Sequence, residues 1–545
     1  MTDSDKSIAA GVIRYHKRTK HHYERYARSP DYMDWANQPV PFRFYQDTPK
    51  VELPFLQEEP AAAHLDLYRT ARMPARRIGL ASIAGLLELS VALSAWKSAG
   101  QSRWSLRVNP SSGNLHPTET YLVLPRVEKH PAGVCHYNPL HHELERRAAL
   151  PEEVWARLSR HFRSEGFLVG LSSIFWRESW KYGERALRYC NHDVGHAIAA
   201  IRMAANIYGW QLHWLDAVGD DEIAAVLGID QTSYEPLEAE HPDLLGWICP
   251  AAPHEMPSDL PGEVVDAIGQ IPFEGTPNPL SHKRIDWETI GATARLTRKP
   301  PTTPLRPSLS NFQDLAGRDR IERAADLIRR RRSATAFSTA GTISGQAFLE
   351  ILEKTLPAND RSPFDWGPLP PSTHLILFVH SIQDLAPGLY AYVRWLPDLE
   401  SLKRQCRSDF QWSHIDPEAP LFLLEEGRYR QTATMVSCHQ SIAGESVFSL
   451  GMLARFRENI ETAPYRYRWL FWEAGMIGQV LYLEAEAHSL RGTGIGCYFD
   501  DAVHDLLGLK DDTYQSMYHF TVGLPVEDDR LTTLPPYFHI QRHGA

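Results

Sequence analysis

A loop between Asn109 and Pro117 concentrates hydroxyl and amide side chains among turn-forming residues. Ser111, Ser112 and Asn114, together with free backbone N–H groups, could hydrogen-bond along the edge of a planar polar ligand. The alternative is an ordinary turn held by its own side chains, and the loop taken alone favours that alternative. The same kind of choice arises at three other segments of the chain.

A run of three arginines, Arg330 to Arg332, comes directly before Ser333. Guanidinium groups match phosphate oxygens in charge-assisted pairs, so the run and the serine could hold a phosphate group. Taken alone, the run is more typical of a solvated basic turn. Ser344, a little downstream, is predicted to cap a helix.

Glycines recur between Arg491 and Asp500, in the sequence RGTGIGCYFD. Gly492 is predicted to end a helix, but this does not explain Gly494 and Gly496, which would let the backbone approach a flat ligand closely. The segment follows a predicted helix rather than a strand, so it does not indicate a dinucleotide-binding phosphate loop.

Lys181 and Tyr182 are adjacent, and either side chain can act as an acid, a base or a hydrogen-bond donor. A surface lysine beside a core tyrosine is the more usual explanation of such a pair. His192 and His196 have the spacing of a metal-binding pair on a helix, but no third ligand follows at a clear spacing. No metal site is predicted.

These segments belong to a chain of 545 residues, which is long enough for two to four domains. Apolar residues make up 43% and charged residues 23%, as in globular proteins, and the net charge is −10. That balance argues against a general nucleic-acid-binding protein. No apolar run approaches the roughly 18 residues of a membrane span, and the start of the chain does not resemble a signal peptide. Six cysteines without a C-x-x-C pair favour a reducing cytoplasm.

The segment from Pro250 to Pro307 holds eleven of the 39 prolines and is predicted to be an irregular connector between two halves. The halves repeat in order. Residues 118–124 correspond to 373–379 at an offset of 255, Gly195 corresponds to Gly478 at 283, and Asp220 corresponds to Asp500 at 280. Three blocks in the same order indicate a duplication.

Each half combines apolar runs typical of buried strands with one long apolar helix, which predicts an α+β unit. The helices are expected to end at Gly209 and Gly492. Two such units in one chain imitate a homodimer, whose ligand sites often lie at the interface. The polar loop exists only once, because its counterpart in the second half is Trp366–Leu369.

Taken together, these segments resemble a known family. The set RRSATAF, NPSSGNLHPTE and GQVLYLEAEAHSLRGTGIGCYFDD…LLGL resembles the FMN-dependent nitroreductase superfamily, and YHKRTKHH…WANQP, RVNPSSGNLHPTETY and WKYGERALRYC are similar to its SagB-type branch, which includes azoline dehydrogenases. The resemblance implies two tandem nitroreductase-like domains, each a mixed sheet flanked by helices, which form an intramolecular pseudo-dimer. The expected parts are an arm (1–60), domain 1 (61–250), the proline-rich connector (251–320) and domain 2 (321–545).

The resemblance also implies one complete FMN site at the seam of the two domains. Thr335 stands where the family often has a basic residue, and Arg530 or Arg542 is the expected replacement. The residues expected to contact FMN are Arg331 and Ser333 at the phosphate and ribityl end, Gly494, Gly496 and the backbone of Cys497 and Tyr498 near N5 of the ring, and Ser111, Ser112 and Asn114 from the first half. Lys181 and Tyr182 match the Lys-Tyr pair of azoline dehydrogenases and are the expected catalytic residues.

The expected activity is hydride transfer at N5 of FMN, with an azoline ring of a modified peptide as substrate. One alternative is a nitroaromatic or quinone reductase that uses NAD(P)H, and another is a non-catalytic module that docks a peptide or a partner protein. We expect a small-molecule or peptide substrate, no nucleic acid or membrane partner, and a cytoplasmic protein. Its state is either a monomer with pseudo-dimeric halves or a homodimer.

Overall fold

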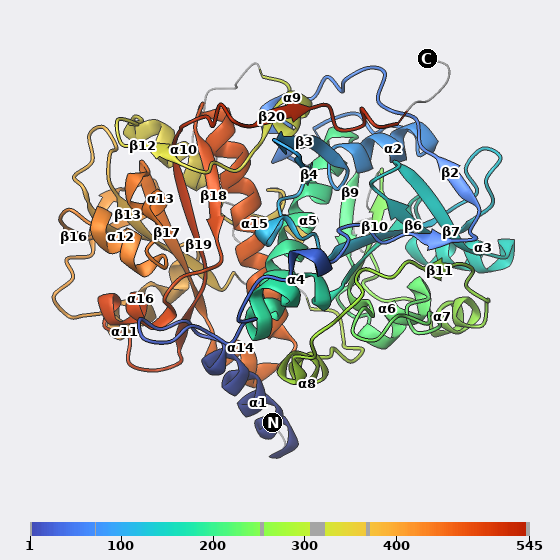
Figure 1. Cartoon of the computed structure of the whole chain (residues 1–545), viewed down its shortest axis with the longest axis horizontal. Helices are drawn as coiled ribbons and strands as arrows, with labels where there is room; N and C mark the ends of the chain where they lie inside the picture. Colours follow the sequence, from blue (N-terminus) through green and yellow to red (C-terminus); the bar gives the residue numbers. More distant parts are fainter. Residues whose placement is uncertain (1–2, 71, 251–255, 306–321, 367–370, 541–545) are drawn as a thin grey trace.

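A computed structural model of the chain describes residues 3–70, 72–250, 256–305, 322–366 and 371–540. Two α+β halves lie side by side, and the two longest helices run between their sheets (Figure 1). This confirms the predicted fold class of two tandem nitroreductase-like units. No helix among the described residues is long and apolar enough to cross a membrane.

The first half is built on a seven-stranded sheet in the order β2-β7-β6-β5-β8-β10-β9. All its strand pairs are antiparallel, where a mixed sheet was expected. Its strands are β2 (Lys50–Glu52), β5 (Thr118–Leu124), β6 (Gly133–Asn138), β7 (Glu143–Ala149), β8 (Phe167–Ser173), β9 (Gln211–Trp214) and β10 (His241–Cys249). Its helices are α2 (Leu80–Glu88), α3 (Glu152–Phe162), α4 (Phe175–Tyr182), α5 (Ala186–Ile207) and α6 (Asp220–Leu227).

The second half repeats this plan with an eight-stranded sheet, which is also antiparallel in every pair of its described strands. Its strands are β12 (Phe337–Ser338), β13 (Thr373–Val379), β14 (Gly388–Tyr392), β15 (Ser413–Asp416), β16 (Ala419–Glu426), β17 (Phe448–Arg455), β18 (Arg491–Ile495) and β19 (Tyr514–Pro525). Its helices are α9 (Ala324–Arg330), α10 (Gly345–Glu353), α11 (Leu399–Gln405), α12 (Arg430–Val436), α13 (Ser441–Glu445), α14 (Arg457–Thr462), α15 (Arg466–Ala487) and α16 (Asp500–Leu507). Ser344 caps α10 as predicted, since its Oγ accepts from the N–H of Ala347 at 3.1 Å.

Helices α5 and α15 form the centre of the interface between the halves (Figure 1). Both have 22 residues, and their first and last positions correspond at the same offset of 280. They cross at Gly195 and Gly475, where a Cβ atom on Gly195 would lie 2.2 Å from the carbonyl oxygen of Trp472. The predicted offset of 283 for these helices is therefore wrong. The glycine that corresponds to Gly195 is the one at the crossing, because only a residue without a side chain lets the two backbones approach so closely.

Two reciprocal ion pairs show the pseudo-twofold relation between the halves. Arg188 on α5 contacts Asp500 at 2.7 Å, and Arg468 on α15 contacts Asp220 at 2.8 Å. Both arginines and both aspartates correspond at the offset of 280, as was predicted for Asp220 and Asp500. Because all four side chains are buried, each pair fixes the start of α6 or α16 against the central helix of the other half.

Two local predictions differ from the structure. The segment around the connector contains α7 (Gly262–Gly269) and α8 (Glu288–Leu296), and the apolar face of α7 packs into the core of the first half. Its apolar spacing therefore outweighs the neighbouring prolines. Helix α15 ends before Gly492: Ser489 takes the left-handed conformation at its end, with φ of 59°, and Gly492 lies inside β18.

Chain segments from the two ends complete the seam. Helix α1 (Asp3–Arg18) contacts both halves, since Tyr15 Oη donates to the carbonyl of Glu184 and His16 packs on Phe456. The hairpin of β3 (Leu93–Ala99) and β4 (Ser102–Arg107) in the first half pairs with β20 (Thr532–Leu534) near the end of the chain. Strands β1 (Tyr45–Gln46) and β11 (Thr276–Pro277) form a separate pair.

Candidate active site at the seam of the two halves

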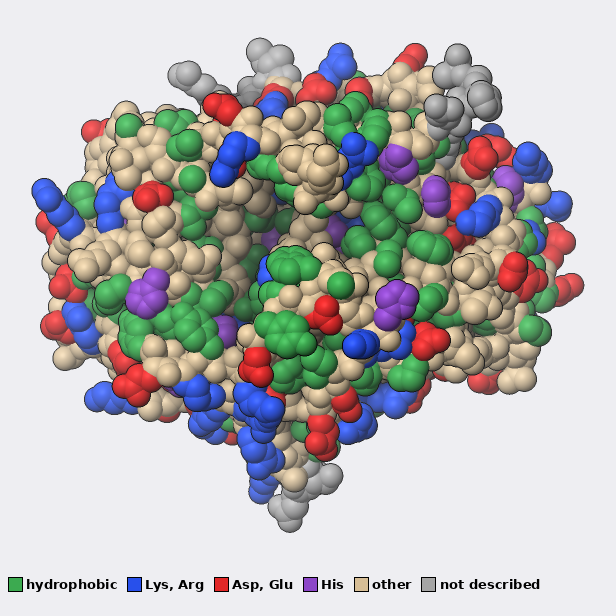
Figure 2. Space-filling view, viewed as in Figure 1, with side chains coloured by type: hydrophobic (Ala, Val, Ile, Leu, Met, Phe, Trp, Pro, Cys, Tyr) green, Lys and Arg blue, Asp and Glu red, His purple; other side chains and the backbone are tan. Residues whose placement is uncertain are grey.

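A cavity of about 670 Å³ opens between the halves, and it appears as the hollow near the centre of the face in Figure 2. It is lined by loops, a helix end and a strand that are far apart in the sequence. Nine of the residues proposed from sequence line it: Ser111, Ser112, Asn114 and Tyr182 from the first half, and Arg331, Ser333, Gly494, Gly496 and Cys497 from the second. The two halves thus contribute different kinds of side chain to one cavity.

The serine loop reaches the cavity because it leads into β5, a fully buried strand of the first sheet. Asp193 on α5 holds the loop, accepting from the N–H of Ser112 at 3.0 Å and from its Oγ at 3.2 Å. Asn114 is bound within the first half: its Nδ2 donates to the carbonyl of Ser105, and its Oδ1 contacts His116 at 2.9 Å. The turn is therefore held by its own side chains and by Asp193, and residues 111–114 all line the cavity.

Lys181 and Tyr182 stand at the end of α4, directly behind the serine loop. Gly113 has a φ of 60°, and a Cβ atom there would lie 2.5 Å from Tyr182 Oη and 3.2 Å from Lys181 Nζ. Lys181 does not itself line the cavity, but it adjoins the glycine that does. Burial and the nearby Glu178 carboxyl raise the pKa of Tyr182 well above its usual value, so its hydroxyl stays protonated.

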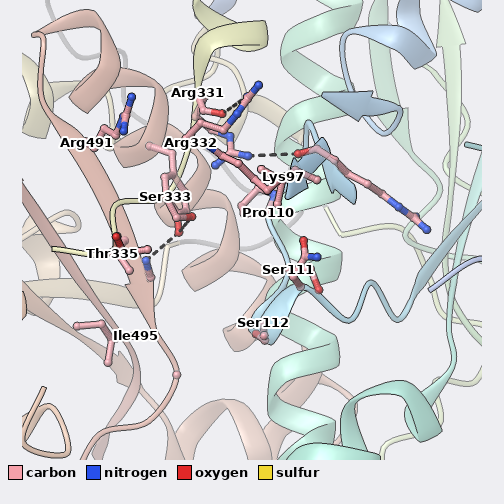
Figure 3. A pocket seen from close by; sticks show the side chains of 18 of the residues that line it. Lys97, Pro110, Ser111, Ser112, Arg331, Arg332, Ser333, Thr335, Arg491 and Ile495 are labelled. Atoms are coloured by element: carbon pink, nitrogen blue, oxygen red, sulfur yellow. Dashed lines mark hydrogen bonds between the residues drawn. The ribbon is translucent and has the colours of Figure 1, made fainter. Parts of the chain in front are cut away.

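Arg331 brings a buried positive charge to the opposite side of the cavity (Figure 3). Its Nη2 donates to the carbonyl of Arg107 at 3.2 Å, and its guanidinium lies 5.0 Å from the ring centre of Tyr482. Its Nε and Nη1, like Nε of Arg107, have no hydrogen-bond partner among the described residues. Burial lowers the pKa of both groups, that of Arg107 to about 10. Buried, unpartnered guanidinium N–H groups at a cavity fit an anionic ligand such as a phosphate.

Three more cations surround Arg331, namely Lys97, Arg332 and Arg491, and all of them line the cavity (Figure 3). The guanidinium of Arg332 donates to the backbone carbonyls of Ser94, Arg329 and Arg331. Sequence reasoning proposed the run Arg330 to Arg332 as a phosphate site, but it missed Lys97 and Arg491 as site residues. Arg332 and Arg491 stood within the quoted motifs, whereas Lys97 on β3 gave no signal in its local sequence.

The structure places Thr335 and one of the two arginines that were expected to replace its missing charge. Thr335 lines the cavity. Arg530 is 87% exposed and pairs with Asp528 at 2.7 Å, and it does not line the cavity. Arg542 lies outside the described residues. Among the described residues, positive charge beside Thr335 therefore comes from the β3–β4 hairpin and from β18 rather than from Arg530.

Tyrosine side chains pack closely against the glycines in and directly after strand β18. The N–H of Gly494 donates to Tyr482 Oη at 2.9 Å, and a Cβ atom on Gly494 would lie 1.9 Å from Tyr518 Oη. A Cβ atom on Gly496 would lie 2.1 Å from the ring of Tyr189. Three tyrosines from three elements, which sequence reasoning missed, thus enclose the glycine backbone and exclude any side chain at these positions.

The residues after Gly496 face different ways. Cys497 lines the cavity, whereas the side chain of Tyr498 is buried, donates to the carbonyl of Ser516 and stacks on His519. The two histidines of the considered metal pair are also engaged: His192 Nε2 contacts the carbonyl of Met517 and His196 Nε2 contacts Tyr518 Oη. Among the residues with described positions, no group of three or more metal-ligating side chains is found.

Comparisons with known proteins assign the second half. Residues 328–524 match the model of the Nitroreductase family. The matched residues make up most of the second half of the chain. Two curated relatives match parts of the chain: the trifolitoxin-processing protein TfxB of Rhizobium leguminosarum bv. trifolii, at 31% identity over 130 residues, and a protein of Methanocaldococcus jannaschii provisionally named nitroreductase MJ1384, at 28% over 128 residues. Each alignment covers 22% of this chain, and the chain spans 35% of TfxB and 64% of MJ1384.

A crystal structure from Anabaena variabilis, provisionally described as a nitroreductase, resembles the whole molecule. It matches with a TM-score of 0.68 and 21% sequence identity, over 95% of this chain and 99% of that chain. The likeness concerns the fold. It shows that the two halves together form an arrangement found in another chain.

The residues at the seam fit the cofactor suggested by the resemblance. Unpartnered N–H groups of Arg331 and Arg107 suit a phosphate, and the side-chain-free backbone at Gly494 and Gly496 suits a flat ring. Near the serine loop, burial raises the pKa of Asp193 to about 7, so this carboxyl carries less than a full negative charge at neutral pH.

Proposed function

We propose that this protein is an FMN-dependent oxidoreductase of the SagB-type dehydrogenase kind, which oxidises azoline rings of a modified peptide. The observation that carries the proposal is the meeting of two complementary sets of residues at one cavity. The second half supplies Arg331 and bare glycine backbone, and the first half supplies Arg107 and, directly behind Gly113, a lysine and a tyrosine.

Each set has a distinct task in this proposal. Arg331 and Arg107 hold the phosphate through N–H groups that have no partner within the described part of the protein. The backbone of Gly494 and Gly496 lies against the ring. FMN, when bound, supplies a hydride acceptor and donor at N5. The tyrosines around the glycines fill the space behind the strand and exclude water from it.

Lys181 and Tyr182 handle the proton that must leave the substrate together with the hydride. Tyr182 keeps its proton because its pKa is raised, so it donates a hydrogen bond to the substrate ring. Lys181 Nζ lies beside the same glycine and can accept a proton when its amine is neutral. The relative TfxB is named for processing trifolitoxin, which supports a role for this protein in processing a comparable toxin.

The first experiment identifies the chromophore. The purified full-length protein is denatured, and the released compound is identified and counted per chain. One FMN per chain is expected, because the described residues furnish the seam cavity with both sets of groups. A protein that releases no flavin and takes up none from added FMN would instead be a docking module, and this proposal would be wrong.

The second experiment separates the two enzymatic possibilities. Lys181→Ala should abolish oxidation of a thiazoline-containing peptide, while reduction of a quinone by NAD(P)H at the same flavin should stay within about threefold of wild type. Glu461→Ala is the matched control, because Glu461 is the counterpart of Lys181 in the second half and pairs with Arg457 on the surface helix α14. If the wild-type protein reduces quinones but never oxidises the peptide, the NAD(P)H-dependent reductase is the correct function.

A further inference from the structure

Two cysteines meet beside the cavity. Cys438 and Cys497 are partly exposed, whereas Cys135, Cys190, Cys249 and Cys406 are buried. Cys497 lines the cavity directly after Gly496, and Cys438 lies in the turn that follows α12. The sequence separates them by 59 positions, so only the fold brings them together.

Hydrogen bonds on both sides hold these two segments against each other. The N–H of Phe499 donates to the carbonyl of Val436 at 2.8 Å, and Nε2 of Gln440 donates to the carbonyl of Cys497 at 2.9 Å. Between these bonds the two thiols lie close enough for each to shift the pKa of the other. Backbones tied in this way keep two thiols within reach of each other, as a disulfide requires.

The charges around the pair make the two sulfur atoms unequal. The interaction with Cys438 and the guanidinium of Arg185 lower the pKa of Cys497, against the effects of burial and Asp500. The interaction with Cys497 and burial raise the pKa of Cys438. Since the thiolate is the nucleophile in thiol chemistry, Cys497 is the attacking sulfur and Cys438 is the resolving one.

We infer that Cys438 and Cys497 form a reversible dithiol–disulfide couple at the mouth of the active-site cavity, which exchanges with low-molecular-weight disulfides. The partly exposed position of both thiols gives such a small disulfide access to the pair. The couple depends on these two side chains and their segments, and it does not require the proposed flavin chemistry.

The exchange balances in two steps. The Cys497 thiolate attacks one sulfur of the small disulfide, so a mixed disulfide forms and one small thiolate leaves. Cys438 then gives up its proton to that thiolate and attacks the Cys497 sulfur, so the Cys438–Cys497 bond forms and the second small thiolate leaves. The protein loses two electrons and the small disulfide gains two. A dithiol reductant reverses both steps.

Closing this bond would change the cavity. The turn after α12 would be joined covalently to the segment after β18, where Cys497 and Gly496 form part of the wall. The redox state of the small thiol pool would thereby set the rigidity of this wall.

The test uses the native full-length protein and trypsin. Each cysteine lies alone in one tryptic peptide, Cys438 in residues 431–455 and Cys497 in residues 492–510. The protein is incubated with glutathione disulfide, blocked with N-ethylmaleimide before unfolding, digested and analysed by mass spectrometry. We expect the two peptides to appear joined, lighter by two hydrogen atoms than their sum, and to separate again after treatment of the native protein with dithiothreitol.

Three variants assign the roles. Cys438→Ser should accumulate glutathione on Cys497, whereas Cys497→Ser should take up glutathione at Cys438 at least tenfold more slowly. Cys406→Ser, which changes a buried cysteine outside the pair, should cross-link like the wild type. The inference is wrong if wild-type protein gives no joined peptides, if they form only after unfolding, or if dithiothreitol does not separate them. These three outcomes are read on wild-type protein and do not depend on the folding of a variant.

Discussion

Two corresponding strands at the pseudo-twofold interface, β18 and β9, differ in the side chain at one equivalent position. In β18, Gly494 leaves its place free of a side chain and lines the cavity. In β9, Trp214 stands at the corresponding position, at the offset of 280 that relates the central helices. Its ring lies 4.9 Å from that of Trp469 and 5.9 Å from that of Trp472. Trp469 is in turn the counterpart of Tyr189, which borders the cavity. Where one side of the interface has a cavity, the other has a cluster of indole rings.

This difference shows how a fused pair of domains can specialise. In a homodimer both sites carry the same residues, whereas here one site keeps its glycine and the other is filled. Interactions that hold the halves together are kept on both sides, as Arg188 with Asp500 and Arg468 with Asp220 demonstrate. Residues that serve the ligand are kept on one side, and packing or ion pairs take their place on the other. For example, Arg202, bound to Asp365, stands where the second half has Tyr482.

The largest expected effect comes from a truncation within the tryptophan cluster of Trp214, Trp469 and Trp472, called here the filled side of the interface. Trp214→Ala should lower the free energy of unfolding by about 3–5 kcal/mol, as for other buried aromatic truncations, and should leave the flavin content unchanged. Urea denaturation followed by circular dichroism measures the first quantity, and denaturing release of the chromophore measures the second. Trp35→Ala is the control, since that side chain is 65% exposed. A stable variant that has lost its flavin would mean that the filled side takes part in binding.

The next effect concerns the open side of the interface, which is the side that contains the cavity. Arg331→Ala should weaken FMN binding by roughly a hundredfold, or about 3 kcal/mol, because it removes charge-assisted hydrogen bonds from a buried phosphate. Fluorescence titration of the flavin-free protein with FMN measures the affinity. Arg330→Ala is the matched control, because the adjacent side chain is 46% exposed and pairs with Glu322. Equal losses in both variants would show that general positive charge, rather than Arg331, holds the cofactor.

The sequence predicted the open side better than the filled one. Strands over 118–124 and 373–379, the position of the serine loop before a strand and the division of residues between the halves all follow from local patterns. The relation of Trp214 to Gly494 could not be seen, because local similarity around Gly478 suggested an offset of 283. The true offset is fixed by the contact of Gly195 with Gly475, which is a property of tertiary packing.

The cations of the site also show that contacts between distant segments could not be predicted from local sequence. Arg331 stood in a recognisable motif and Arg107 begins another, whereas Lys97, on the same hairpin as Arg107, has no distinctive local sequence. Both hairpin residues reach the cavity because the hairpin pairs with β20, near the opposite end of the chain, and because the carbonyl of Arg107 accepts from Arg331. Contacts of this range leave no periodic pattern in a single sequence.

A smaller effect on stability should appear as a pH dependence. Burial raises the pKa of Asp193 to about 7 in the folded protein, above the value near 3.9 of an unfolded chain. Between these values the folded state keeps a proton that the unfolded state releases, so stability falls as the pH rises. The contribution of one such group is at most about 1.4 kcal/mol per pH unit. Asp193→Asn should remove this contribution to the pH dependence of the unfolding free energy, as measured by urea denaturation at pH 5, 6 and 7.

The corresponding experiment on another buried acid serves as the comparison. The pKa of Asp243 is also raised to about 7 by burial, and this carboxyl accepts from Ser173 in the first sheet rather than at the cavity. Asp243→Asn should therefore reduce the same slope without changing FMN affinity. If Asp193→Asn kept the full wild-type slope, Asp193 would be ionised in the folded protein, and the cavity would carry a negative charge beside the serine loop.

The smallest expected effect restores the residue that the family often has. Thr335→Lys should change FMN affinity by less than about threefold, because Lys97, Arg332 and Arg491 already line the cavity that Thr335 faces. A further cation gains attraction to the phosphate but is repelled by its neighbours; in the wild type, burial together with repulsion from Arg331 already lowers the pKa of Arg332 to about 10. Thr335→Met, which adds length without charge, separates steric from electrostatic effects. A gain of tenfold or more with lysine but not with methionine would mean that the hairpin cations do not replace the missing contact, and that the open side, like the filled one, has lost part of its original function.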